Sequence, residues 1–105
     1  MKLEGYCFDI EANNLYLQGT KMWYIKFKST DGSRSLSVFP FREDKETTKN
    51  KIQDWIDSFP DGSHVVGWNE LGYDVWALWR FLDIKPVVGK KGKDYLGGKE
   101  VVFVD

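Results

Sequence analysis

The sequence FDIEAN at residues 8–13 decides the fold assignment, because it places two carboxylates two positions apart in an apolar run. In a strand, side chains at positions i and i+2 point to the same face. We therefore expect Asp9 and Glu11 to lie side by side, about 6–7 Å apart along the strand. Two like charges this close repel each other unless a cation lies between them. The stretch predicts half of a divalent-metal site.

The same pair has a simpler interpretation, in which the strand is an exposed edge and both carboxylates are solvated. A third carboxylate, Asp74, favours the metal site, because it lies where a buried strand at residues 64–68 gives way to a helix at 70–82. Ligands of open α/β sheets bind beyond the carboxyl ends of strands. Oxygen ligands of this kind suit Mg²⁺ or Mn²⁺. Asp74 also has a structural interpretation, as an acidic residue favoured at a helix start.

Length and composition limit the remaining possibilities. The 105 residues fit one small domain, and 16% aromatic residues supply material for a core. A net charge of −1 excludes a global basic field, so nucleic-acid binding has to be local or metal-mediated. Cys7 is the only cysteine and is expected to be a buried small hydrophobe in a cytoplasmic protein. No apolar run of about 18 residues occurs, so no membrane span is expected.

Hydrophobic periodicity predicts seven elements. Strands are expected at residues 3–12, 22–29, 34–39, 64–68 and 100–105, and helices at 45–59 and 70–82. The first strand is continuously apolar, which predicts burial on both faces. Lysine and glycine dominate residues 85–99, which predicts a mobile basic loop. The predicted fold is α/β, with a mixed five-stranded sheet: a three-strand antiparallel meander, then parallel strands, with flanking helices.

The motifs and their order resemble the DEDD family of 3′–5′ exonucleases, whose first motif is D-x-E. Residues 69–74 resemble the second motif, in which Asn precedes an aromatic-Asp pair by a few residues. The closest resemblance is to the proofreading domain of podovirus-type family A DNA polymerases, whose first motif also reads D-I-E-A-N. It covers residues 3–105 and implies a ribonuclease-H-like fold.

The resemblance also implies roles for particular residues. Asp9, Glu11 and Asp74 match catalytic metal ligands for two Mg²⁺ or Mn²⁺ ions that hydrolyse the 3′-terminal nucleotide of single-stranded DNA. Four further residues match positions beside the terminal nucleotide or in the first motif: Ala12, Asn13, Leu15 and Asn69. The implied partners are a single-stranded DNA 3′ terminus and the rest of a polymerase chain.

One part of the family pattern is missing from this sequence. The family has a fourth carboxylate in a Tyr-x-x-x-Asp or His-x-x-x-x-Asp motif, and neither spacing occurs here: Tyr95 is followed four residues later by Lys99, and His64 five residues later by Asn69. We therefore expect residues 1–105 to be an exonuclease-like domain truncated before its third motif. The alternatives are another DEDD enzyme, such as an exoribonuclease, and a non-catalytic fragment that only binds metal or nucleic acid.

Overall fold

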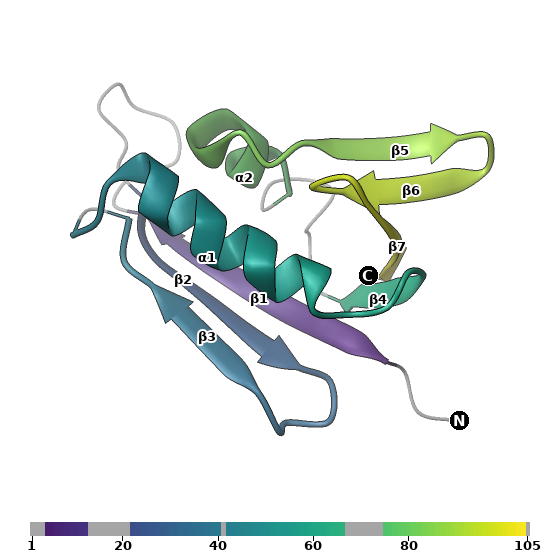
Figure 1. Ribbon diagram of the computed structural model, residues 1–105, viewed down its shortest axis with the longest axis horizontal. Coiled ribbons are helices and arrows are strands. Elements are labelled where there is room, and N and C mark those ends of the chain that lie inside the picture. The colour runs from purple at the N-terminus through teal and green to yellow at the C-terminus, as the bar shows by residue number, and fades with distance from the viewer. Residues whose placement is uncertain (1–3, 13–21, 41, 67–74, 105) are drawn as a thin grey trace.

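The structure is a computed structural model that describes residues 4–12, 22–40, 42–66 and 75–104. One mixed seven-stranded sheet carries two helices on one face, and α1 runs across the front of the first three strands (Figure 1). The elements, in chain order, are β1 (Gly5–Ala12), β2 (Met22–Ser29), β3 (Ser35–Val38), α1 (Lys45–Asp57), β4 (Ser63–Val66), α2 (Val75–Leu82), β5 (Pro86–Lys90), β6 (Lys93–Leu96) and β7 (Lys99–Val104).

The strand order is β3-β2-β1-β4-β7-β6-β5. The first three strands form an antiparallel meander, β4 is parallel to β1, and β7 is parallel to β4. The predicted α/β fold with a mixed sheet is confirmed. The predicted number of five strands is wrong, because β5 and β6 add an antiparallel hairpin to the edge of β7.

This hairpin also corrects the prediction of a basic loop at residues 85–99. Two-residue turns join β5 to β6 and β6 to β7, and all four turn residues have positive φ: Lys91 (52°), Gly92 (77°), Gly97 (59°) and Gly98 (82°). Positive φ at both central residues suits the right-handed twist of a hairpin. The glycines therefore reverse the chain tightly between paired strands.

The first strand alternates between two environments. Tyr6, Phe8 and Ile10 are buried against the helices, whereas Cys7 and Asp9 are exposed on the opposite face. The predictions of two-sided burial for this strand and of a buried Cys7 are therefore wrong. Since both helices contribute to the cluster around Tyr6 and Phe8, no described helix covers the other face of the sheet.

An aromatic group fills the centre of the core between β1, β2 and α1. The Tyr6 ring lies 4.9 Å from that of Phe59, and Phe8 stacks on Phe27 at 5.2 Å, centroid to centroid. Trp55 of α1 meets Phe27 at 5.9 Å. Aromatic pairs at these separations add about 0.5–1.5 kcal/mol each beyond their buried area. The buried face of α1, which carries Ile52, Trp55 and Ile56, thus packs onto the sheet within the helix predicted at residues 45–59.

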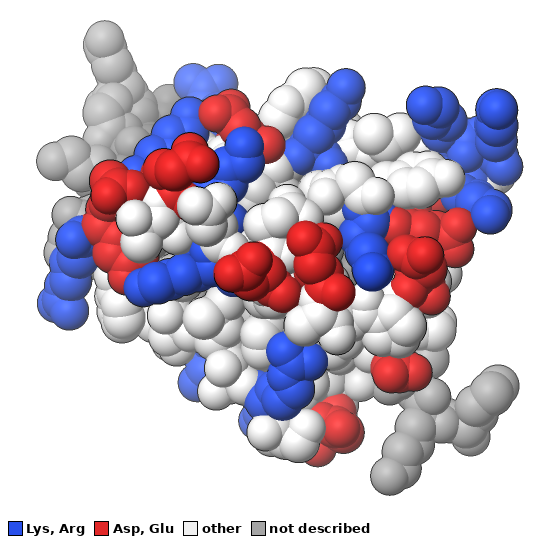
Figure 2. Space-filling model, in the orientation of Figure 1, with Lys and Arg blue, Asp and Glu red and all other residues white. Residues whose placement is uncertain are grey.

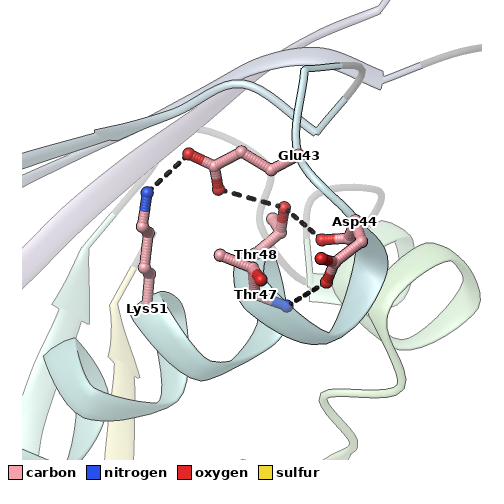
Figure 3. Close-up of polar contacts among 5 residues, drawn as sticks. All are labelled: Glu43, Asp44, Thr47, Thr48 and Lys51. Carbon is pink, nitrogen blue, oxygen red and sulfur yellow. Dashed lines mark hydrogen bonds and ion pairs between the residues drawn. The ribbon is translucent and has the colours of Figure 1, made fainter.

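The first turn of α1 is held by polar contacts (Figure 3). The carboxylate of Asp44 accepts a hydrogen bond from the Thr47 backbone N–H at 2.7 Å, and Thr48 donates to the Asp44 carbonyl oxygen at 3.1 Å. Glu43 also joins these contacts, because its carboxylate accepts a hydrogen bond from the Thr48 hydroxyl at 3.4 Å and pairs with Lys51. The backbone hydrogen bond from Thr47 lowers the pKa of the Asp44 carboxyl below its ordinary value. A side-chain cap of this kind satisfies a backbone N–H that the helix leaves unpaired.

Asp44 should therefore make the stability of the chain depend on pH. Its folded pKa is lowered, so its contribution is present above the unfolded pKa of about 3.9 and is lost as the pH falls through the folded pKa. Between pH 6 and pH 2, the urea midpoint of the wild-type chain should fall further than that of Asp44→Asn, which keeps a capping oxygen without the charge. Asp54→Asn removes a charge from the middle of α1 as a control. Parallel pH profiles for wild type and Asp44→Asn would contradict this role.

Candidate functional site

Asp9 is the predicted site residue that the structure describes in full. It lies in the second half of β1 on the exposed face of the sheet, opposite Lys26 of β2 in the antiparallel register. β1 lies inside the sheet, paired with β2 along the motif and with β4 over Gly5–Cys7. The alternative interpretation, in which both carboxylates of the motif are solvated, stays open. A carboxylate here is presented on a central strand and remains open to a ligand.

β1 has a parallel neighbour over its first half. The last described β1–β4 pair is Cys7 with Val66, and β7 pairs with the same end of β4 through Val104. Asp9 lies two residues further along β1 than this last described pair. In open α/β sheets, this region beyond the carboxyl ends of parallel strands is where ligands bind.

The register between β1 and β4 depends on a close backbone approach. Gly5 is paired with His64, and a Cβ at Gly5 would lie 1.9 Å from the His64 carbonyl oxygen. Any side chain at this position would force the two strands apart. Gly5 thus helps to fix the register between β4 and the strand that carries Asp9.

The other predicted site residues are described only in part or not at all. Glu11 and Ala12 belong to the backbone of β1, where Glu11 is paired with Tyr24 and the register shifts between Glu11 and Ala12. Their side chains lie outside the described part of the structure. Four predicted residues lie wholly outside the described residues: Asn13, Leu15, Asn69 and Asp74. Their predicted convergence with Asp9 stays a prediction.

A complete metal-binding set is not found within residues 4–12, 22–40, 42–66 and 75–104, where no three His, Cys, Asp or Glu side chains gather. Of the three predicted ligands, this search includes only the side chain of Asp9. An exposed carboxylate at the end of a central strand suits a hard divalent cation. The described residues therefore supply one ligand of the predicted site.

Lys26 and Lys28 add a feature that the sequence argument did not connect with the site. Both are exposed on β2, opposite Asp9 and Cys7 respectively in the register. Directly opposed residues of an antiparallel pair lie about 4.5–5.5 Å apart at their Cβ atoms, so Lys26 places positive charge beside Asp9. Two features of the sequence could have placed these lysines beside β1. Apolar and polar residues alternate along β2, and the Asp31-Gly32 turn follows it.

Comparison of the chain with models of protein families, with curated proteins and with solved structures found no match. The helices α1 and α2, of 13 and 8 residues, are also too short to cross a membrane, and no other helix lies in the described part of the chain.

Cys7 offers a direct test of whether the face that carries Asp9 is accessible. Because its thiol is exposed and the chain contains one cysteine, native protein should react with a disulfide reagent at a rate comparable to that of the urea-unfolded chain. The measurement is the absorbance of the released thiolate, with Cys7→Ser as the blank. A native rate far below the unfolded one would show that this face is covered.

Proposed function

We propose that this chain carries the first two motifs of a 3′–5′ exonuclease domain of the kind that proofreads for phage-type family A DNA polymerases. The observation that carries the proposal is Asp9, exposed near the carboxyl end of a central strand that belongs to a three-strand meander and has a parallel neighbour. The D-x-E spacing then sets Glu11 two residues further along the same strand. This is the arrangement expected for the first motif of a ribonuclease-H-like exonuclease.

In this proposal Asp9, Glu11 and Asp74 hold divalent cations at the carboxyl ends of β1 and β4. When bound, such cations lower the pKa of a water molecule and stabilise charge on the leaving oxygen of a phosphodiester. The role of the protein is to hold these carboxylates on rigid elements and to leave the site open to a strand end. Asn69 and Leu15 would contact the terminal nucleotide, as the resemblance implies.

The proposed substrate is a frayed single-stranded 3′ terminus. Extruding or unpairing a terminal nucleotide costs a few kcal/mol, and least for a mismatched one. The enzyme would then select mismatched 3′ ends because their terminal base pair costs less to unpair. This selection needs no contact that identifies a base. The proposed location is the cytoplasm of a bacterial host.

A nuclease assay tests the proposal on a 5′-labelled single-stranded DNA oligonucleotide with Mg²⁺ or Mn²⁺. We expect stepwise shortening from the 3′ end, slowed at least about 100-fold in Asp9→Asn, the scale lost when a group that stabilises developing charge is removed. Asp57→Asn is the matched control, because it removes the same negative charge from an exposed position of α1.

Three results would contradict the proposal. Products that shorten from the 5′ end, or internal cuts, would indicate another nuclease class. Activity that survives in Asp9→Asn would indicate a contaminating enzyme or another site. Absence of hydrolysis with either cation would favour the alternative that the chain only binds metal or nucleic acid.

A further inference from the structure

A groove lies along the β5–β6 hairpin, away from the carboxylates of the candidate site. It has a volume of about 520 Å³ and is lined by Lys85, Val87, Lys90, Lys91, Tyr95 and Gly98. Figure 2 shows lysine and arginine side chains gathered at the tip of this hairpin, at the right of the view. The groove therefore combines an aromatic ring with three cations.

The positive charge of the groove is not neutralised by the ion pairs found in the described structure. Lys93 is paired with Glu100 at 3.1 Å, and Lys99 with Asp61 at 3.6 Å. The three groove lysines are Lys85, Lys90 and Lys91. None of them forms an ion pair of this kind with another described residue. The nearby Asp94 carboxylate accepts a hydrogen bond from the Gly89 backbone N–H at 2.8 Å. The groove thus presents an excess of positive charge to a ligand.

Exposed aromatic rings continue the surface from the groove onto α2. The Lys85 ammonium lies 5.8 Å from the centroid of the Trp79 ring, so this lysine joins the helix to the groove. Trp79 is 43% exposed, and its ring centre is 5.7 Å from that of Trp76, which is 41% exposed. Two large exposed indoles, one of them beside the Lys85 ammonium, are unusual for a surface that only faces solvent.

The chemistry of this surface favours a nucleic-acid strand over a protein strand. β5 is an edge strand, but it begins with Pro86, its register shifts between Val87 and Lys90, and it ends in lysine. These features protect an edge against pairing with another β-strand. Cations that track a phosphate backbone, with aromatic rings on which bases stack, are the two components of single-strand binding sites.

We propose that the groove and the Trp76–Trp79 face of α2 form a binding surface for single-stranded nucleic acid. Lys85, Lys90 and Lys91 contact phosphates, and Tyr95 and Trp79 stack against bases. The inference deepens the proposed exonuclease function, since such a surface would hold the strand upstream of its 3′ end. The binding itself requires neither a metal ion nor hydrolysis.

The test is fluorescence anisotropy of the full chain with a labelled oligothymidylate of about 12 nucleotides, within the site sizes of single-strand binders. EDTA is present, so failure of hydrolysis and failure of binding are measured separately. The variant Lys85→Gln/Lys90→Gln/Lys91→Gln should lower affinity at least about tenfold and reduce the slope of log Kd against log salt by about 2, since each phosphate contact contributes about 0.7.

A matched control removes three lysines of α1: Lys45→Gln/Lys49→Gln/Lys51→Gln. It has the same net charge as the groove variant and should bind like the wild-type chain. Equal losses in both triple variants would show that only net charge matters, and they would overturn the proposed surface. Asp9→Asn should bind normally, which separates this surface from the candidate metal site.

Stacking is tested with Trp79→Ala and Tyr95→Ala, which should each weaken binding at least about fivefold. Trp79→Phe keeps an aromatic ring and should restore most of the affinity. Thermal unfolding of each variant shows that the exposed residue was replaced without loss of the fold. A competition experiment uses inorganic polyphosphate, which has phosphates but no bases, to displace the labelled oligonucleotide. If it competes as well as DNA and the aromatic variants bind normally, the groove is a general anion site and the proposal is wrong.

Discussion

The two-residue alternation of β1 is the constraint on which the rest of the structure depends. Burying Tyr6, Phe8 and Ile10 beneath the helices is worth about 1.5–3 kcal/mol for each side chain. A slip of one residue would move all three to the open face of the sheet and bury Cys7 and Asp9 instead. An unpaired charge in that core would be costly, so the hydrophobic contacts that stabilise the fold also hold Asp9 on the accessible face.

The topology of the sheet then determines where that accessible face can meet a ligand. β1 and β4 run parallel, as do β4 and β7, so their carboxyl ends share one edge, and Asp9 lies two residues beyond the last described β1–β4 pair, Cys7 with Val66. Gly5 permits this register, since a side chain there would collide with the backbone at His64. At the other side of the sheet, the β5–β6 hairpin contacts α2 and carries the exposed lysines. Asp9 lies on β1 and the groove lysines on the β5–β6 hairpin and the segment before it, so variants of Asp9 and of the groove lysines are tested separately.

Much of this architecture could be predicted from the sequence, and the errors have physical causes. Alternation along β2 and the helical stripe of Ile52, Trp55 and Ile56 placed those elements, because one-sided burial leaves a periodic pattern. The sequence argument missed the β5–β6 hairpin because lysine and glycine are common in loops, although Lys91-Gly92 and Gly97-Gly98 form the two-residue turns before and after β6. Cys7 was misplaced because an apolar run alone does not show whether one face of a strand or both are covered. The predicted approach of Asp74 to Asp9 stays a prediction, because it depends on long-range packing that no local pattern encodes.

The central claim is that the carboxyl end of β1 binds a divalent cation, and paramagnetic broadening by Mn²⁺ tests it most directly. In amide spectra of the nitrogen-15-labelled chain, substoichiometric Mn²⁺ should broaden signals from residue 9 onward in β1 and from the segment that leads into α2. Asp9→Asn should abolish this effect. Broadening centred instead on the acidic residues near the hairpin, such as Glu100 and Asp61, or an unchanged pattern in Asp9→Asn, would contradict the account.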